Sequence, residues 1–229
     1  MCFGVLKSSL GKKVVMAVTG LMLLLFVIAH LAGNLQIFLG ADWLNGYSEH
    51  LEEIPLLLWP ARVILLTALV LHIFTAVWLT LENRKARPIP YAAQDTVQAS
   101  LASRTMIFTG SAVFLFIIYH LLHFTWGITN PEFFGLTDPQ GREDIYSMVI
   151  LSFQSPVTSG VYTLALFILS MHLGHGSCSF LQTLGLTRES MLKRMRKAGT
   201  VLGWLIFLGF ASIPAASLLG VLQPLQGGR

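Results

Sequence analysis

The chain has 229 residues, of which only 11% are charged and 54% are hydrophobic. A soluble domain carries about 25% charged residues, so the composition excludes an ordinary soluble enzyme, and it equally excludes a disordered chain. Two cysteines are too few for a disulfide scaffold. The net charge of +4 does not indicate a nucleic-acid-binding protein, because the charges lie in short clusters between long apolar runs. The composition predicts an all-α integral membrane protein in which residues 1–229 form one transmembrane domain.

Uncharged runs predict five transmembrane helices in chain order. The run between Lys13 and Asp42 holds about 28 residues and the run between Arg62 and Glu82 about 19, against the roughly 20 residues that cross the hydrocarbon. In the fourth run, Gln154, Ser155 and Pro156 delay the start of the helix. The predicted helices span residues 14–39, 57–81, 105–127, 157–182 and 198–222.

The loops between these helices alternate in charge. The N-terminal segment and the even-numbered loops are basic, whereas the odd-numbered loops are acidic, with Arg142 as their only internal base. Because lysine and arginine accumulate in cytoplasmic loops, the pattern predicts a cytoplasmic N-terminus and an outward-facing C-terminus. The acidic residues of the odd-numbered loops are Asp42, Glu49, Glu52, Glu53, Glu132, Asp138, Glu143 and Asp144.

Histidines inside the predicted helices carry the functional signal. An ionisable side chain within a bilayer is costly and indicates a functional site, although a single histidine is equally explained by a hydrogen bond between helices. Histidines on four consecutive helices favour a shared site. They are His30, His72, His120, His123, His172 and His175.

The predicted depths sort four of these histidines into two levels. Counted from the cytoplasmic helix ends, His30 and His120 lie about 24 and 22 Å up, at 1.5 Å per residue. On the same scale His72 and His172 lie about 14 and 15 Å up. Each level draws on two different helices, and facing histidines in the core of a four-helix bundle can bind a cofactor. Two levels of paired imidazoles predict that the first four helices form a bundle with two haems b, each iron held from both faces.

Other ligands and other cofactors are alternatives to this pairing. His123 and His175 lie three residues beyond His120 and His172 on nearly the same helix faces, so they are alternative ligands. They could also bind haem propionates, donate to a quinone carbonyl or form hydrogen bonds between helices. Zinc favours about four ligands at one level. A proton relay favours Asp or Glu between the histidines, and the predicted spans contain none.

Five short segments together resemble a known family. They are Ser8-Ser9-Leu10-Gly11-Lys12-Lys13 with Thr19-Gly20 and His30-Leu31-Ala32-Gly33-Asn34-Leu35, then Tyr119-His120-Leu121-Leu122-His123-Phe124, and Met171-His172-Leu173-Gly174-His175-Gly176. In them, and over essentially its whole length, the chain resembles the cytochrome b subunit of succinate dehydrogenase or fumarate reductase. The likeness is to the single-subunit, five-helix, two-haem branch that works with menaquinone.

The resemblance implies a role for each matching histidine. His30 and His120 correspond to the ligands of the distal haem, and His72 and His172 to those of the proximal haem. The resemblance further implies a bacterial or archaeal cytoplasmic membrane, with a flavoprotein and an iron–sulfur protein docked on the cytoplasmic face. The chain would not be an enzyme on its own; it would carry electrons between the iron–sulfur subunit and menaquinone in the lipid phase.

Two further positions bear on proton transfer in that family. Glu52 lies where the family has an acidic residue near the outer quinone site, which implies a quinone-linked proton relay; the alternative is a solvated loop carboxylate. Ser170 stands where some fumarate reductases carry a membrane glutamate, so the resemblance does not extend to that proton path.

Two alternative functions remain open from the sequence. One is the cytochrome b subunit of a hydrogenase or a formate dehydrogenase, which differs in the soluble subunits it binds. The other is a haem-free transporter with a polar histidine core.

Overall fold

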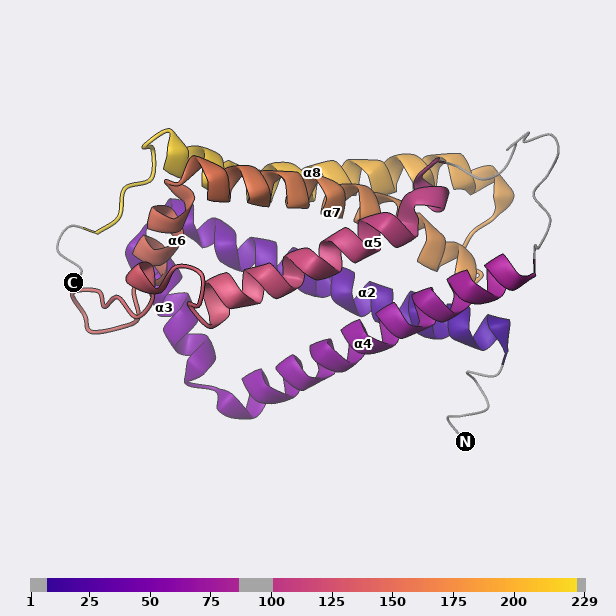
Figure 1. Cartoon of the computed structure of the whole chain (residues 1–229), viewed down its shortest axis with the longest axis horizontal. Helices are drawn as coiled ribbons and strands as arrows, with labels where there is room; N and C mark the ends of the chain where they lie inside the picture. Colours follow the sequence, from indigo (N-terminus) through magenta and orange to yellow (C-terminus); the bar gives the residue numbers. More distant parts are fainter. Residues whose placement is uncertain (1–7, 87–100, 226–229) are drawn as a thin grey trace.

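The computed structural model describes residues 8–86 and 101–225. Within them, five helices are long and apolar enough to cross a membrane, and there is no β-strand, only an isolated bridge between Thr137 and Glu143. The predicted all-α fold with five spans is therefore confirmed (Figure 1). The spans are built on α2 (Ser9–Asn34), α4 (Pro55–Lys85), α5 (Leu101–His120), α7 (Pro156–Thr183) and α8 (Leu192–Leu218).

The helices extend past the predicted bounds where charged residues flank the apolar runs. α2 begins at Ser9 because Ser8 caps it, its Oγ accepting a hydrogen bond from the Gly11 N–H at 3.0 Å. α8 likewise begins at Leu192, before a run of basic residues. A charge ends the apolar stretch but does not end the helix, because lysine and arginine are good helix formers. The predicted start of α7 is confirmed, with Ser155 as its cap.

The two acidic loops contain helices that the sequence did not predict. α3 (Ala41–Glu52) follows the 3₁₀-helix η1 (Leu35–Leu39), and α6 (Ile145–Phe153) precedes α7. Both lie at the same end of the molecule (Figure 1). Much of the core lies at this end, where buried residues of α3, α6, α7 and α8 pack together.

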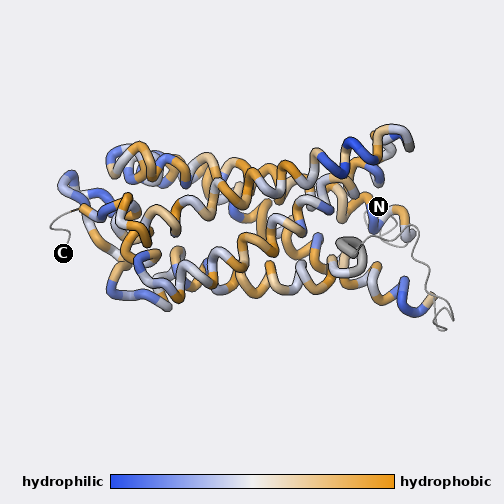
Figure 2. The backbone as a smooth tube through the Cα atoms, turned by 90° about the horizontal axis from the view of Figure 1, so that it is seen from above, coloured by the Kyte–Doolittle hydropathy of each residue, from blue (hydrophilic) through white to orange (hydrophobic). Residues whose placement is uncertain are grey.

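The two ends of the molecule are hydrophilic and are separated by an apolar middle (Figure 2). At the basic end, α2, α5 and α8 begin and α4 and α7 end; at the acidic end lie α3 and α6. We call the two ends acidic and basic after the charges of the loops that lie there. Loops that alternate between an acidic and a basic end fit a multi-pass membrane protein.

Helix packing places α8 outside a group of four helices. α2 packs against α4 and α7, and α5 packs against α7, whereas α8 packs mainly on α7. Glycines allow α7 and α8 to touch backbone to backbone. A Cβ on Gly199 would lie 2.4 Å from the Gly174 carbonyl oxygen, and a Cβ on Gly203 would lie 2.5 Å from the Ser170 carbonyl oxygen. Small residues at such an interface are typical of helix packing in membranes.

A buried polar network joins α3 to α6 at the acidic end. The Asn45 side chain is 1% exposed, and its Nδ2 donates to Asp138 Oδ2 at 3.2 Å and to Asp144 Oδ1 at 3.1 Å. Arg142 Nε donates to Asp138 Oδ2 at 2.7 Å. Burial opposes ionisation of Asp138, but the hydrogen bonds from Arg142 and Asn45 outweigh it and hold the pKa of this carboxyl below its ordinary value. Asp138 is therefore a carboxylate that the fold requires in its charged form.

An ion pair ties α2 to α4 at the basic end. Lys12 is 2% exposed, and it pairs with Glu82 while its ammonium lies 4.4 Å from the centre of the Trp78 ring. Trp78 Nε1 also donates to Glu82 Oε1 at 2.8 Å. Lys12 is thus a structural residue as well as part of the basic cluster.

Candidate functional site

One pair of histidines lies near the acidic end. His30 on α2 and His120 at the end of α5 face each other with ring centroids 5.9 Å apart and ring planes at 84°. Phe26 stacks on His30 at 5.4 Å, and Phe210 of α8 lies 5.8 Å from it. We call His30 and His120 the acidic-end pair.

A second pair lies nearer the basic end. His72 lies on α4 and His172 on α7, and each packs against a glycine of a neighbouring helix. A Cβ on Gly20 of α2 would lie 3.0 Å from His72 Cε1, and a Cβ on Gly110 of α5 would lie 3.2 Å from His172 Cε1. We call His72 and His172 the basic-end pair.

The two pairs lie at different levels of the bundle. His72 is level with Gly20, and His30 lies ten positions further along α2, a rise of about 15 Å. The structure thus brings together the histidines that the sequence analysis paired, His30 with His120 and His72 with His172, and separates the two pairs along the bundle axis.

Threonines fix the basic-end pair in one tautomer. Thr19 Oγ1 lies 3.3 Å from His72 Nδ1, and Thr109 Oγ1 lies 3.1 Å from His172 Nδ1. Both hydroxyls donate their proton to a carbonyl of their own helix, Thr19 to Val15 at 2.7 Å and Thr109 to Met106 at 3.1 Å. Each threonine oxygen is then left as an acceptor, so the imidazole donates from Nδ1 and keeps a lone pair on Nε2. His72 Nδ1 also lies 3.1 Å from the Met16 carbonyl oxygen, which requires the same tautomer.

The sequence analysis assigned no role to the two threonines, although Thr19-Gly20 lies in a segment quoted for the resemblance and the chain contains a signal for both. Thr-Gly followed by nine residues and a histidine occurs twice, at Thr19-Gly20 before His30 and at Thr109-Gly110 before His120. Each copy supplies one histidine to the acidic-end pair and one threonine to the basic-end pair. Each repeat therefore contributes residues to both pairs of histidines.

The two remaining intramembrane histidines lie next to these pairs but in different surroundings. His123 lies in the π-helix η2 (Leu121–Thr125), where the Trp126 N–H donates to the Leu121 carbonyl at 3.0 Å. Its Nδ1 lies 2.9 Å from the Tyr162 hydroxyl, which also contacts His120. His123 therefore takes part in an interhelical hydrogen bond. His175 is half-buried on α7 and interacts electrostatically with Arg196 of α8.

The other predicted site residues lie outside the bundle interior or are already bonded. Glu52 is the last residue of α3, and Glu52, Glu49 and His50 are all exposed at the acidic end. Ser170 is buried, and its Oγ donates to the Phe167 carbonyl at 2.8 Å. The structure thus brings Glu52 to the same end as the acidic-end pair but not into contact with buried His123.

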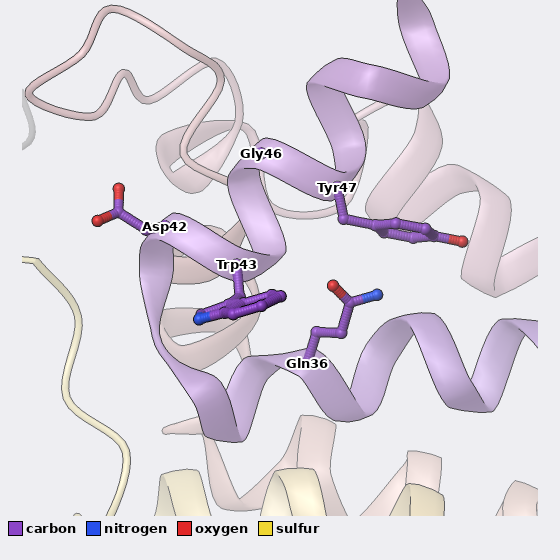
Figure 3. A pocket seen from close by; sticks show the side chains of 5 residues that line it. All are labelled: Gln36, Asp42, Trp43, Gly46 and Tyr47. Atoms are coloured by element: carbon purple, nitrogen blue, oxygen red, sulfur yellow. The ribbon is translucent and has the colours of Figure 1, made fainter.

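A cavity of about 330 Å³ opens between η1 and α3 at the acidic end. Figure 3 shows Gln36 directed from η1 toward the rings of Trp43 and Tyr47 on α3. Its volume is at the lower end of the range of roughly 300–1,000 Å³ for small-molecule pockets. Its walls combine the two aromatic rings with the Gln36 amide, whereas the Asp42 carboxylate is directed away from the cavity (Figure 3). The sequence analysis missed this cavity, because it depends on how α3 folds back onto η1.

The acidic-end pair has the spacing expected of two imidazoles that could hold one metal ion between them. Two imidazoles that bind one metal from opposite sides, at about 2 Å each, have ring centroids about 6 Å apart, and the acidic-end pair matches this spacing. Among the described residues there is no group of three or more His, Cys, Asp or Glu side chains able to hold a metal ion. Two imidazoles alone would hold a metal ion only where a further group, such as a macrocycle, supplied its other ligands.

The chain matches no protein-family model, no curated protein and no solved structure.

Proposed function

We propose that the chain is the dihaem cytochrome b membrane anchor of a succinate:quinone oxidoreductase. The observation that carries this proposal is the arrangement of four histidines in two cross-helix pairs at two levels of one bundle. The sequence resemblance supports the identity of the complex.

The four histidines hold the two haems in this proposal. Bound haem supplies one-electron transfer. His72 and His172 hold the haem at the basic end, where the flavoprotein and the iron–sulfur subunit dock. His30 and His120 hold the haem at the acidic end, close to the quinone. The basic end is cytoplasmic, so the N-terminus lies in the cytoplasm and the C-terminus outside a bacterial or archaeal membrane.

Quinone chemistry belongs at the acidic end, near the distal haem. A menaquinone must exchange with lipid and also reach a proton source, and a carboxylate within reach serves as a relay. Glu52 is exposed there, and the cavity at Gln36, Trp43 and Tyr47 offers aromatic walls for a quinone ring.

Glu52→Gln tests this placement, because glutamine keeps the shape and a hydrogen bond but carries no proton. Quinone-linked turnover of the complex should be lost, while both haem spectra and succinate oxidation with an artificial acceptor remain. Glu49→Gln, three residues away on the same helix, is the matched control. Normal quinone reduction in the Glu52 variant would reject Glu52 as the relay.

A pyridine haemochrome assay on the purified protein tests the function itself. Two haems b per chain, both low-spin, are expected, together with a flavoprotein and an iron–sulfur protein that co-purify. Hydrogenase or formate dehydrogenase subunits in their place would reassign the chain to those complexes. A protein without haem would overturn the proposal and favour a transporter with a polar histidine core.

A further inference from the structure

Tyr162 lies between two histidines at the acidic end of the candidate site. It is 4% exposed, on the second turn of α7. Its hydroxyl oxygen lies 2.9 Å from His123 Nδ1 and 3.4 Å from His120 Nδ1. The rings of Phe153 and Phe116 pack on it with centroids 4.9 and 5.1 Å away. Because the ring is packed from several sides, the hydroxyl stays between the two imidazoles.

The hydroxyl has one proton for two nitrogen neighbours, which leaves two possible directions for the hydrogen-bond chain. A neutral imidazole carries one N–H and one lone pair. If Tyr162 donates to His120 Nδ1, the His120 proton moves to Nε2, and that nitrogen has no lone pair for a metal. If Tyr162 donates to His123 Nδ1, its oxygen accepts from the His120 Nδ1–H, and His120 Nε2 is free to bind.

The geometry points to Tyr162 as the positioning residue for His120, accepting its Nδ1 proton while donating to His123. This inference rests on the proposed function, in which His120 binds haem iron. His123 then has a defined part, because it accepts the tyrosine proton, and a hydroxyl that donates a hydrogen bond is a stronger acceptor for the His120 Nδ1–H. The arrangement leaves a buried donor at His123 Nε2, which has no hydrogen-bond partner within the described residues.

The basic-end pair uses the same principle with different residues. There, Thr109 commits its proton to its own helix and accepts from His172 Nδ1. Tyr162 has no such carbonyl partner among its described hydrogen bonds, and His123 takes that part instead. A hydrogen bond accepted from the far nitrogen of a metal-binding histidine raises the basicity of that ligand, which stabilises the oxidised metal and lowers its reduction potential.

Redox titration of the haem absorbance in the purified complex tests this assignment. Tyr162→Phe keeps the packed ring and removes the acceptor, so the midpoint potential of one haem should shift upward while the other stays unchanged. Thr109→Val should shift the other haem instead. Tyr119→Phe is the matched control, because it removes a hydroxyl from the adjacent ring without touching the His120–Tyr162–His123 chain, and it should shift neither.

His123→Phe provides a second route to the same answer. It keeps an aromatic ring in the stack but leaves the tyrosine proton without its partner, which weakens the tyrosine oxygen as an acceptor. A smaller upward shift of the same haem as in Tyr162→Phe is expected, with both irons still low-spin. This variant decides the question if Tyr162→Phe does not accumulate.

The outcomes separate this inference from the proposed function. If Tyr162→Phe retains two haems with unshifted potentials, the role of Tyr162 is overturned, but the proposed dihaem cytochrome is not. The same result in His123→Phe has this meaning if Tyr162→Phe does not accumulate. If Tyr162→Phe shifts the midpoint potential of the same haem as Thr109→Val, Tyr162 does not act on the acidic-end pair, and the inference is rejected. Wild-type protein without haem would overturn the function on which the inference rests.

Discussion

At the scale of single residues, the paired histidines differ in the side chains that contact them. His72 and His172 each contact a threonine hydroxyl through Nδ1 and pack against a glycine of a neighbouring helix. The Nδ1 of His120 contacts the Tyr162 hydroxyl. A buried imidazole whose Nδ1 is already bonded can offer only Nε2 to a ligand, so these neighbours decide which nitrogen is available.

Replacement of His72 tests the basic-end pair. His72→Ala should remove one of the two haems and lower the thermal stability of the protein, because a cofactor that binds only the folded state stabilises it by mass action. Haemochrome quantification and a low-temperature absorption spectrum measure the loss. His123→Ala is the control and should keep both irons low-spin.

Two outcomes would contradict these ligand assignments. Retention of both haems with unchanged spectra in His72→Ala would exclude His72 as a ligand. Loss of a haem in His123→Ala would make His123, rather than His120, the partner of His30.

At the scale of elements, the contact between α7 and α8 depends on glycine. Gly199 and Gly203 lie four residues apart on one face of α8, and both face the backbone of α7. The α7 backbone at this contact includes the carbonyl of Ser170, two residues before His172. Helix α8 contributes no histidine to either pair, but it packs directly behind α7, which contributes His172.

A side chain at Gly203 should therefore push the two helices apart. Gly203→Val places atoms where the Ser170 carbonyl already lies, and overpacking of this kind costs about 1–3 kcal/mol. A lower unfolding temperature in detergent is expected. Gly160→Ala is the matched control on α7, because a Cβ there meets nothing within 4 Å, and equal stability of the two variants would contradict the close contact.

The network between α3 and α6 should make stability depend on pH. Since the folded-state pKa of Asp138 is below its ordinary value, its contribution is fully present above the unfolded pKa of about 3.9. That contribution is lost as the pH falls through the folded pKa. Asp42, Arg142 and Asp144 are the other charged groups of this cluster.

Asp138→Asn tests how much the charge of Asp138 contributes to stability. The variant should unfold at a lower temperature than the wild type at pH 7, and the difference should shrink as the pH is lowered below about 4. Thermal unfolding in detergent across this range measures it, with Glu49→Gln, an exposed carboxylate on α3, as the control. A constant difference at every pH would show that Asp138 contributes through packing rather than through its charge.

At the scale of the whole molecule, the alternating loop charges predict which end faces the cytoplasm. Gln140 at the acidic end and Lys193 at the basic end are both exposed. In a Cys2→Ser background, Gln140→Cys should react with an impermeant maleimide in intact cells, and Lys193→Cys only after the membrane is opened. Cys178 is buried and contributes little background. The reverse pattern would invert the proposed orientation and move the soluble partners to the other face.

The sequence by itself determined the five spans, the two charged ends and the two levels of paired histidines. Each of these depends on linear distance along the chain, because helical rise is constant and hydrocarbon excludes charge. The predicted ends of the helices were less accurate, because a charge marks the edge of the hydrocarbon and not the end of a helix. α2 begins at Ser9 and α8 at Leu192, each before its predicted start.

Only the tertiary structure decided what surrounds the histidines. His120 and His123 lie on nearly the same face, as predicted, and only the structure shows that the Tyr162 hydroxyl of α7 contacts Nδ1 of both. The cavity beside Gln36 and the network around Asn45 join segments far apart in the chain. Such contacts depend on which helix faces meet and how closely, and a single sequence encodes these only through the sum of all packing interactions.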